Sequence, residues 1–169
     1  MASTTPLKPS ILDKLIADIG RKRGDGSRDA VPCFLPDLDH FNEAQLRMCI
    51  KRDIGWILND IHFEAAVDLT DFPDIQTSVL NQGLPDLAGT TTGLDGRKKR
   101  ASDIVNAVRA FEQRLRPDSI VVETESDSVD NDNKLHFAIQ GEIRNSVDEN
   151  WIELQTTVDV DDGRVEISS

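Results

Sequence analysis

Residues 134–143, KLHFAIQGEI, alternate between polar and apolar side chains over most of their length. The apolar side chains that share one face of an extended chain here are Leu135, Phe137, Ile139 and Ile143. A period of two is typical of a β-strand that turns one face toward a hydrophobic core. The stretch therefore predicts a sheet in the C-terminal third of the chain.

Three neighbouring stretches extend this pattern. Residues 119–125 (SIVVETE) come before it, and residues 151–160 and 164–168 come after it. Residues 130–133 supply a turn before the quoted strand, and residues 161–163 (DDG) make a tight connection between the last two strands. Strands joined by short turns pair with their sequence neighbours, so we expect an antiparallel β-meander.

The chain before Pro117 shows the helical period instead. Ser10 and Asp13 form a capping-box-like start for a short helix that ends at Gly20, and Asn42 can cap a longer second helix. A third helix follows the basic run 97–100, and Pro117 is expected to stop it. The apolar faces are Ile11, Leu12, Leu15, Ile16 and Ile19 in the first helix, Leu46, Ile50, Ile54, Ile57 and Ile61 in the second, and Ile104, Val105, Val108, Phe111 and Leu115 in the third.

Helices first and strands afterwards indicate the α+β class, with N-terminal helices packed on one face of a C-terminal antiparallel β-meander. The 169 residues, of which 38% are hydrophobic, suffice for one domain with tails. We expect residues 1–41 to be a mobile N-terminal arm that carries the short helix. Residues 42–169 form the α+β domain, and the charged stretch 21–29 (RKRGDGSRD) is either a linker or a docking arm.

The net charge of −12 is concentrated near the C-terminus. Residues 118–169 carry 3 Lys and Arg against 14 Asp and Glu, which gives −11, whereas residues 1–117 carry 16 against 17. Such a surface repels phosphate backbones, so nucleic acid is not expected as a partner. A basic protein groove fits this charge, and so does a merely soluble acidic face.

Signals for chemistry and for secretion are weak. Cys33 and Cys49 lie sixteen positions apart without metal-ligand spacing, and the three histidines are scattered. We therefore expect no metal, no cofactor and no catalytic residues. The chain also lacks a signal-peptide pattern and an apolar stretch of about eighteen residues, so we expect a cytoplasmic protein with no direct membrane insertion.

Three segments carry the functional information: residues 50–59 (IKRDIGWILN), 78–89 (SVLNQGLPDLAG) and 111–117 (FEQRLRP). The first segment belongs to the second helix, whose polar face carries Arg47, Lys51, Arg52 and Asp53; for a lone amphipathic helix these are interpreted as solvated charge. In the second, Gly83 can supply a positive φ and Pro85 fixes the next bend. In the third, Glu112 and Arg114 point about 200° apart on a helix and cannot pair directly, so the more buried charge needs a partner from elsewhere.

These three segments, in this order, resemble the baseplate wedge family of contractile-tailed phages, and within it the TssE subunits of type VI secretion systems. The resemblance covers roughly residues 45–165, and residues 78–89 are its most specific part. The family hallmark near the end of the third helix is Glu-Pro-Arg, where this chain has Glu112, Gln113 and Arg114. Gln113 departs from the hallmark and favours a continuous helix.

The resemblance implies a structural role without catalysis, in a baseplate on the cytoplasmic side of the inner membrane. It implies TssF and TssG as baseplate partners and TssB and TssC as sheath partners, with a C-terminal strand edge offered for strand addition. It also assigns a structural and docking unit, in which we expect Trp56, Leu80 and Leu84 to lie in the core. The members of this unit are Arg52, Trp56, Ser78, Asn81, Gly83, Leu84, Pro85, Asp86, Gly89, Glu112 and Arg114.

Two alternatives remain at this point. One is a phage tail baseplate protein of the same fold, which sequence alone does not separate from a secretion-system subunit. The other is a peptidoglycan hydrolase with two carboxylates, for example Glu64 and Glu112, as acid and base. Because the chain has 31 Asp and Glu, some pair near a groove is expected by chance.

Overall fold

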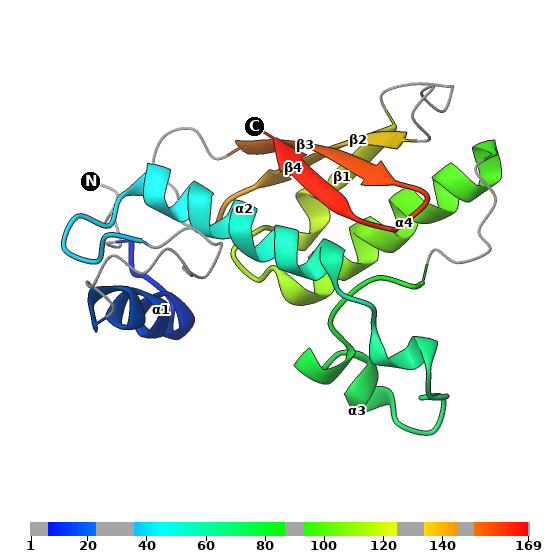
Figure 1. Cartoon of the computed structure of the whole chain (residues 1–169), viewed down its shortest axis with the longest axis horizontal. Helices are drawn as coiled ribbons and strands as arrows, with labels where there is room; N and C mark the ends of the chain where they lie inside the picture. The colour runs from blue at the N-terminus through cyan, green and yellow to red at the C-terminus, as the bar shows by residue number, and fades with distance from the viewer. Residues whose placement is uncertain (1–6, 23–35, 87–92, 125–133, 145–150, 169) are drawn as a thin grey trace.

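The computed structural model describes residues 7–22, 36–86, 93–124, 134–144 and 151–168 (Figure 1). The helices are α1 (Ile11–Lys22), α2 (Glu43–Asn59), α3 (Pro73–Gln76) and α4 (Leu94–Phe111), with short 3-10 turns η1 (Phe63–Ala65), η2 (Val79–Asn81) and η3 (Pro117–Ser119). The strands are β1 (Val121–Thr124), β2 (Lys134–Glu142), β3 (Trp151–Asp159) and β4 (Val165–Ser168).

The four strands form one antiparallel sheet in the order β1-β2-β3-β4. The long central pair is in register from Lys134 opposite Asp159 to Glu142 opposite Trp151. Gly163 has a φ of 74° in the turn between β3 and β4, which is the role expected for the Asp-Asp-Gly turn. Helices α2 and α4 lie on one face of this sheet, so the α+β meander is confirmed (Figure 1).

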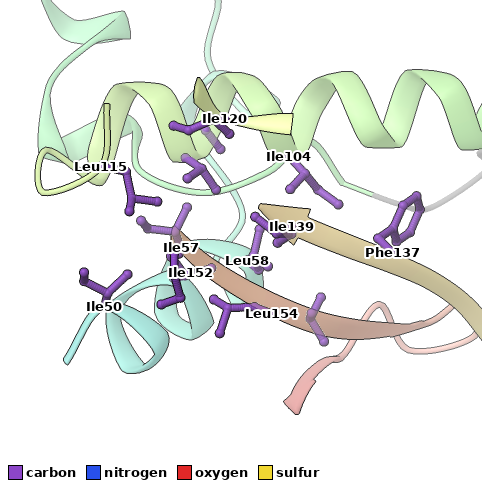
Figure 2. Close-up of a cluster of buried hydrophobic side chains, with 14 of the residues drawn as sticks. Ile50, Ile57, Leu58, Ile104, Leu115, Ile120, Phe137, Ile139, Ile152 and Leu154 are labelled. Atoms are coloured by element: carbon purple, nitrogen blue, oxygen red, sulfur yellow. The ribbon is translucent and has the colours of Figure 1, made fainter. Parts of the chain in front are cut away.

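The core lies between the two long helices and the inner face of the sheet (Figure 2). Ile50 and Ile57 of α2, Ile104 of α4, and Phe137 and Ile139 of β2 are all at most 2% exposed. Complete burial of such side chains contributes about 1.5 to 3 kcal/mol each, so this contact holds the helices on the sheet.

Helix α1 begins with the capping box that the sequence predicts. Ser10 N donates to Asp13 Oδ2 at 2.9 Å, and Asp13 N donates to Ser10 Oγ at 3.0 Å. The apolar face of α1 is nevertheless turned outward, since Ile11 and Leu15 are exposed, whereas Asp13 and Ala17 are buried. The boundary of the N-terminal arm at residue 41 stays a prediction, and most of the stretch 21–29 lies outside the described residues.

Helix α4 ends earlier than the sequence suggests. Its last helical residue is Phe111, and Glu112 has a φ of −99° and a ψ of 83°, which is not helical. The prediction of a helix up to Pro117 is therefore wrong. The chain turns instead, and Leu115 forms an antiparallel bridge with Ile143 at the end of the sheet. Complete burial of the Leu115 side chain favours this path over another helical turn.

Candidate functional site

The turn after α4 brings Glu112 and Arg114 into direct contact. Arg114 donates to Glu112 Oε1 from its backbone N at 2.9 Å and from Nε at 2.8 Å, and its Nη2 donates to Oε2. The expectation that these two side chains cannot pair is wrong. It assumed that both residues lie on a helix, but α4 ends at Phe111, before both of them. Glu112 is the more buried of the two, with 3% of its side chain exposed against 24% for Arg114.

Asp53 of α2 joins two guanidinium groups. Its Oδ2 accepts a hydrogen bond from Arg114 Nη2, and its Oδ1 accepts one from Arg52 Nε at 2.6 Å. Charge-assisted hydrogen bonds of this kind are about twice as strong as neutral ones. Asp53 therefore connects the turn after α4 to the middle of α2.

Arg52 extends the same chain of charges to α1. Its Nη2 lies 2.7 Å from Asp13 Oδ1, and both side chains are almost fully buried. The interpretation of Arg52 as solvated charge is wrong. Its guanidinium carbon also lies 4.9 Å from the centroid of the Trp56 ring, a distance typical of a cation–π contact.

We call these residues the charge chain: Asp13, Arg52, Asp53, Arg114 and Glu112. Burial would raise the pKa of Asp13, but hydrogen bonds from Ser10 and Arg52 hold that pKa below its usual value. Burial opposes the charge on Arg114 as well, and hydrogen bonds and charge interactions with Glu112 and Asp53 raise its pKa overall. Asp13 and Arg114 are thus both charged in the folded protein.

Cys49 lies beside the charge chain on α2. Burial, followed by the negative charge of Asp13 and a hydrogen bond to it, raises the pKa of the Cys49 thiol to about 12. The thiol is completely buried and stays protonated at neutral pH. Its chemistry is therefore that of a packed core group.

The contacts of the charge chain indicate a structural role. It joins α1, α2 and the turn after α4 through specific ion pairs, which fix the position of these elements relative to one another more precisely than apolar contacts alone. Both oxygens of Glu112 accept hydrogen bonds from Arg114, and Arg114 Nη1 is a buried donor with no hydrogen-bond partner among the residues that the structure describes. Within the described ranges, no group of three His, Cys, Asp or Glu side chains is arranged to hold a metal ion.

Residues 78–86 build a second structural feature, at the base of a loop that runs from Asp60 to Asp86. Gly83 has a φ of 129°, as its predicted role requires, and a Cβ at this position would lie 2.6 Å from Asp60 O. Leu84, as expected, is buried, and its N donates to Asp60 O at 2.9 Å. Only glycine fits this crossing of two chain segments.

The polar residues of this segment hold the loop together. Asn81 is buried; its Oδ1 accepts from Glu64 N at 2.9 Å and its Nδ2 donates to Gln76 O at 3.0 Å. Ser78 Oγ accepts from Leu80 N at 3.3 Å. Asp86 lines a pocket beside the loop, together with Pro85, and Gly89 lies outside the described residues.

Two of the three predicted core residues are not in the core. Trp56 is 38% exposed and Leu80 is 70% exposed. Trp56 projects from the side of α2 that meets Arg52, and Leu80 belongs to the short turn η2 on the outside of the loop. The predicted unit is therefore two clusters: Arg52, Trp56, Glu112 and Arg114 in one, and Ser78 to Asp86 in the other.

Sequence reasoning missed the roles of Asp13 and Asp53. Asp13 shows only the capping pattern, which does not reveal its second partner on α2. Asp53 did carry a signal, because it lies three residues after Ile50 and four before Ile57, at the spacing of the apolar stripe. A carboxylate on such a stripe indicates a buried ion pair.

The model of one protein family, described as baseplate wedge protein gp25, matches residues 44–147. Neither a curated protein nor a solved structure matches the chain. The matched segment contains all but the first residue of α2, the loop 60–86, α4 and the pair Glu112 and Arg114, and it covers more than half of the chain. No described helix is long and apolar enough to cross a membrane. The chain therefore belongs to the baseplate wedge gp25 family, whose members are structural parts of phage-type baseplates and which includes TssE.

Proposed function

We propose that this chain is the TssE-type subunit of a type VI secretion baseplate, on the cytoplasmic side of the inner membrane. In this role it joins TssF and TssG in the wedge and starts the polymerisation of a contractile sheath made of TssB and TssC. The observation that carries the sheath part of the proposal is an open strand edge on β3. Main-chain hydrogen bonding at such an edge can start a regular polymer.

The open edge follows from the register of the sheet. Strand β4 pairs only with Gln155 to Val158, so no described strand pairs with the outer side of residues 151–154, where Trp151 O accepts a hydrogen bond from Arg47 Nη1 and the backbone groups of Glu153 are left open. Asp159 N donates toward β4, to Arg164 O at 2.9 Å. Because backbone groups alternate along a strand, Glu153 turns its N–H and C=O to that same side, next to the end of β4.

The opposite edge of the sheet is less suited to strand addition. The 3-10 turn η3, which begins with Pro117, interrupts the line between the bridge at Leu115 and the start of β1 at Val121. A proline and an irregular turn are features that natural sheets use to block edge pairing. The outer side of β3 is therefore the better candidate for the sheath contact.

A proline at Glu153 tests the strand addition. Glu153→Pro removes an outward N–H but leaves the pairing with β2 intact, so the purified variant should keep its melting temperature within a few degrees. Sheath assembly, followed as fluorescent TssB filaments in cells, should be lost. Glu153→Ala is the matched control and should assemble normally, whereas Ile139→Pro in the centre of the sheet should unfold the protein. Normal filaments with Glu153→Pro would refute strand addition at this edge.

Affinity purification of the tagged protein tests the choice of system. Recovery of TssF, TssG or sheath proteins supports the secretion baseplate. Recovery of phage tail proteins instead would assign the chain to a virion, which is the alternative within the same family.

The hydrolase alternative is disfavoured by the environment of Glu112. A general acid or base needs a carboxylate free to exchange a proton with substrate, but both oxygens of Glu112 are held by Arg114. A turnover assay on peptidoglycan decides the matter: lysis by the wild type that disappears in Glu112→Gln would restore the hydrolase.

A further inference from the structure

We propose that the loop from Asp60 to Asp86, which we call the platform, binds a basic segment of another protein through apolar side chains that are exposed here. The platform contains η1, α3 and η2 and stands away from the sheet at the C-terminal end of α2 (Figure 1). The position leaves its outer surface accessible in the isolated chain.

The platform is held in one shape by its base. His62 N donates to Leu84 O at 3.1 Å, and Leu84 N donates to Asp60 O at 2.9 Å, which closes the loop with a short parallel bridge. Arg100 of α4 donates from Nη1 to Pro85 O at 2.8 Å and fixes the exit of the loop. A closed base of this kind lowers the entropy lost on binding, which favours a preformed docking surface.

The outer surface of the platform is unusually apolar for a short loop. Of the fourteen large hydrophobic side chains that are exposed in the described part of the chain, six belong to the platform. They are between 42% and 78% exposed and comprise Ile61, Phe63, Val67, Phe72, Val79 and Leu80. The rigid base keeps them outside, where they face water. Several exposed apolar side chains on one short loop favour an interaction site.

The charge of the platform selects the partner. Its 27 residues contain six Asp or Glu and no Lys or Arg; the acidic residues are Asp60, Glu64, Asp68, Asp71, Asp74 and Asp86. Asp68 and Asp74 are exposed and lie in the same stretch of sequence as the exposed apolar side chains. A partner segment with Lys or Arg between apolar residues complements both properties at once.

A recess next to the platform continues the same surface. It encloses about 340 Å³, and exposed Ile61 lines it together with Leu84 and Pro85. Its lining carries four aspartates against two arginines, so its formal charge is also negative; these are Asp60, Asp86, Asp161, Asp162, Arg100 and Arg164. The recess gives a side chain of the docked segment a place beside the apolar surface.

The charge pattern also separates this partner from other occupants. Two copies of the platform would bring twelve carboxylates together without a cation among them, which opposes self-association through this face. Nucleic acids and anionic membranes carry the same sign of charge as the platform and are repelled. A basic protein segment is the occupant that both charge and apolar exposure favour.

This inference shares with the proposed function only the setting of the baseplate, because the platform and the outer edge of β3 are different surfaces. A photoreactive benzoylphenylalanine placed at Leu80 tests the platform, and the same group at Trp151 reports on the β3 edge. Cells that assemble the complete complex are irradiated, and the joined peptides are identified by mass spectrometry. We expect Leu80 to capture a segment of another protein with net positive charge and apolar residues.

A cross-link from Leu80 to an acidic or uncharged segment, to a second copy of this chain, or to nothing would overturn the inference. A result at Trp151 bears on strand addition alone, so the two ideas can fail separately. A synthetic peptide of the captured segment then supplies the affinity test. The double variant Val79→Ser, Leu80→Ser should bind it at least tenfold more weakly, and weaker binding in higher salt is expected.

The matched control for this test lies on α1. Ile11 and Leu15 are as exposed as the platform residues but belong to a different surface. The variant Ile11→Ser, Leu15→Ser should bind the peptide within twofold of the wild type. An equal loss in both variants would show unspecific apolar binding and overturn the assignment of the platform.

Discussion

Arg52 and Asp13 form a buried ion pair, with 2.7 Å between Nη2 and Oδ1, across 39 residues of sequence. Asp13 lies outside the segment that matches the baseplate wedge family, and Arg52 lies inside it. The pair therefore joins the short helix α1 to the family's part of the fold. It also explains why α1 turns a polar side chain inward and leaves Ile11 and Leu15 exposed.

The first prediction concerns this pair. Asp13→Asn should lower the free energy of unfolding by about 2 kcal/mol at pH 7, because it removes one charge from a buried pair. The folded pKa of Asp13 is lowered below 3.8, so its charge stabilises the fold above that pH and the contribution is lost as the pH falls through the folded pKa. Urea denaturation should show a constant difference between wild type and variant from pH 7 to pH 5 that shrinks below about pH 3.8.

The exposed Asp71→Asn is the control and should leave stability unchanged within about 0.5 kcal/mol.

Thiol labelling of Cys49 gives a second readout, in a Cys33→Ser background at pH 8. Because Asp13 contacts Cys49 and raises its pKa, labelling should be faster in Asp13→Asn than in the parent. A pH-independent difference in stability would contradict the depressed pKa of Asp13.

The second prediction concerns the other end of the charge chain. Glu112→Ala leaves the guanidinium of Arg114 with Asp53 as its remaining carboxylate and should cost about 3 kcal/mol. For a protein of this size that loss lowers the melting temperature by roughly 6 to 12 °C, measured by calorimetry. Glu166→Ala, on an exposed position of β4, should change it by less than about 2 °C. An unchanged melting temperature in Glu112→Ala would mean that the ion pair with Arg114 adds nothing to the fold.

The strands and the α+β order were predictable because their signal is local. Residues 134–143 and 151–160 alternate with a period of two, and this pattern indicates a strand with one buried face without any knowledge of what covers that face. The end of α4 was not predictable in the same way. Gln113 favours a helix, but burial of Leu115 against the end of the sheet is a tertiary effect that overrides this propensity.

The charge chain shows the same limit. The resemblance to the family singled out Arg52, Glu112 and Arg114, but which groups they pair with depends on the turn after α4 and on the placement of α1. The outward position of Leu80 is likewise set by the closed base of the platform. The sequence does not distinguish Leu80 from Leu84, because both are leucines in the same segment and both are expected in the core. In the structure only Leu84 is buried.

The third prediction compares two glycines. Gly83→Ala introduces a Cβ 2.6 Å from Asp60 O at a φ of 129°, so it should cost about 3 kcal/mol or open the base of the platform. Gly55→Ala, within α2, meets only Ile167 Cδ1 at 3.7 Å and should stabilise the protein by about 0.5 to 1 kcal/mol. Denaturation gives both values, and limited proteolysis should cut the platform only in Gly83→Ala. A stable, uncut Gly83→Ala would show that the base has room to shift.

The fourth prediction restores the family's Glu-Pro-Arg. The helix has already ended at Phe111, and the ψ of 83° at Glu112 is outside the α region that a following proline disfavours. Gln113 is exposed, and its backbone N–H donates none of the hydrogen bonds found in the described residues. Gln113→Pro should therefore stabilise the fold by about 0.4 to 1 kcal/mol, because it restricts the unfolded chain without removing a contact.

Gln113→Ala is the control for this variant, since it removes the same side chain but leaves the backbone free, and its stability should match that of the wild type. Urea denaturation of the three proteins measures the difference. A loss of more than about 1 kcal/mol in Gln113→Pro alone would mean that residue 113 needs a φ that proline does not allow. In that case the backbone dihedral angles of the turn that pairs Glu112 with Arg114 would differ in this chain from those that the family's proline imposes.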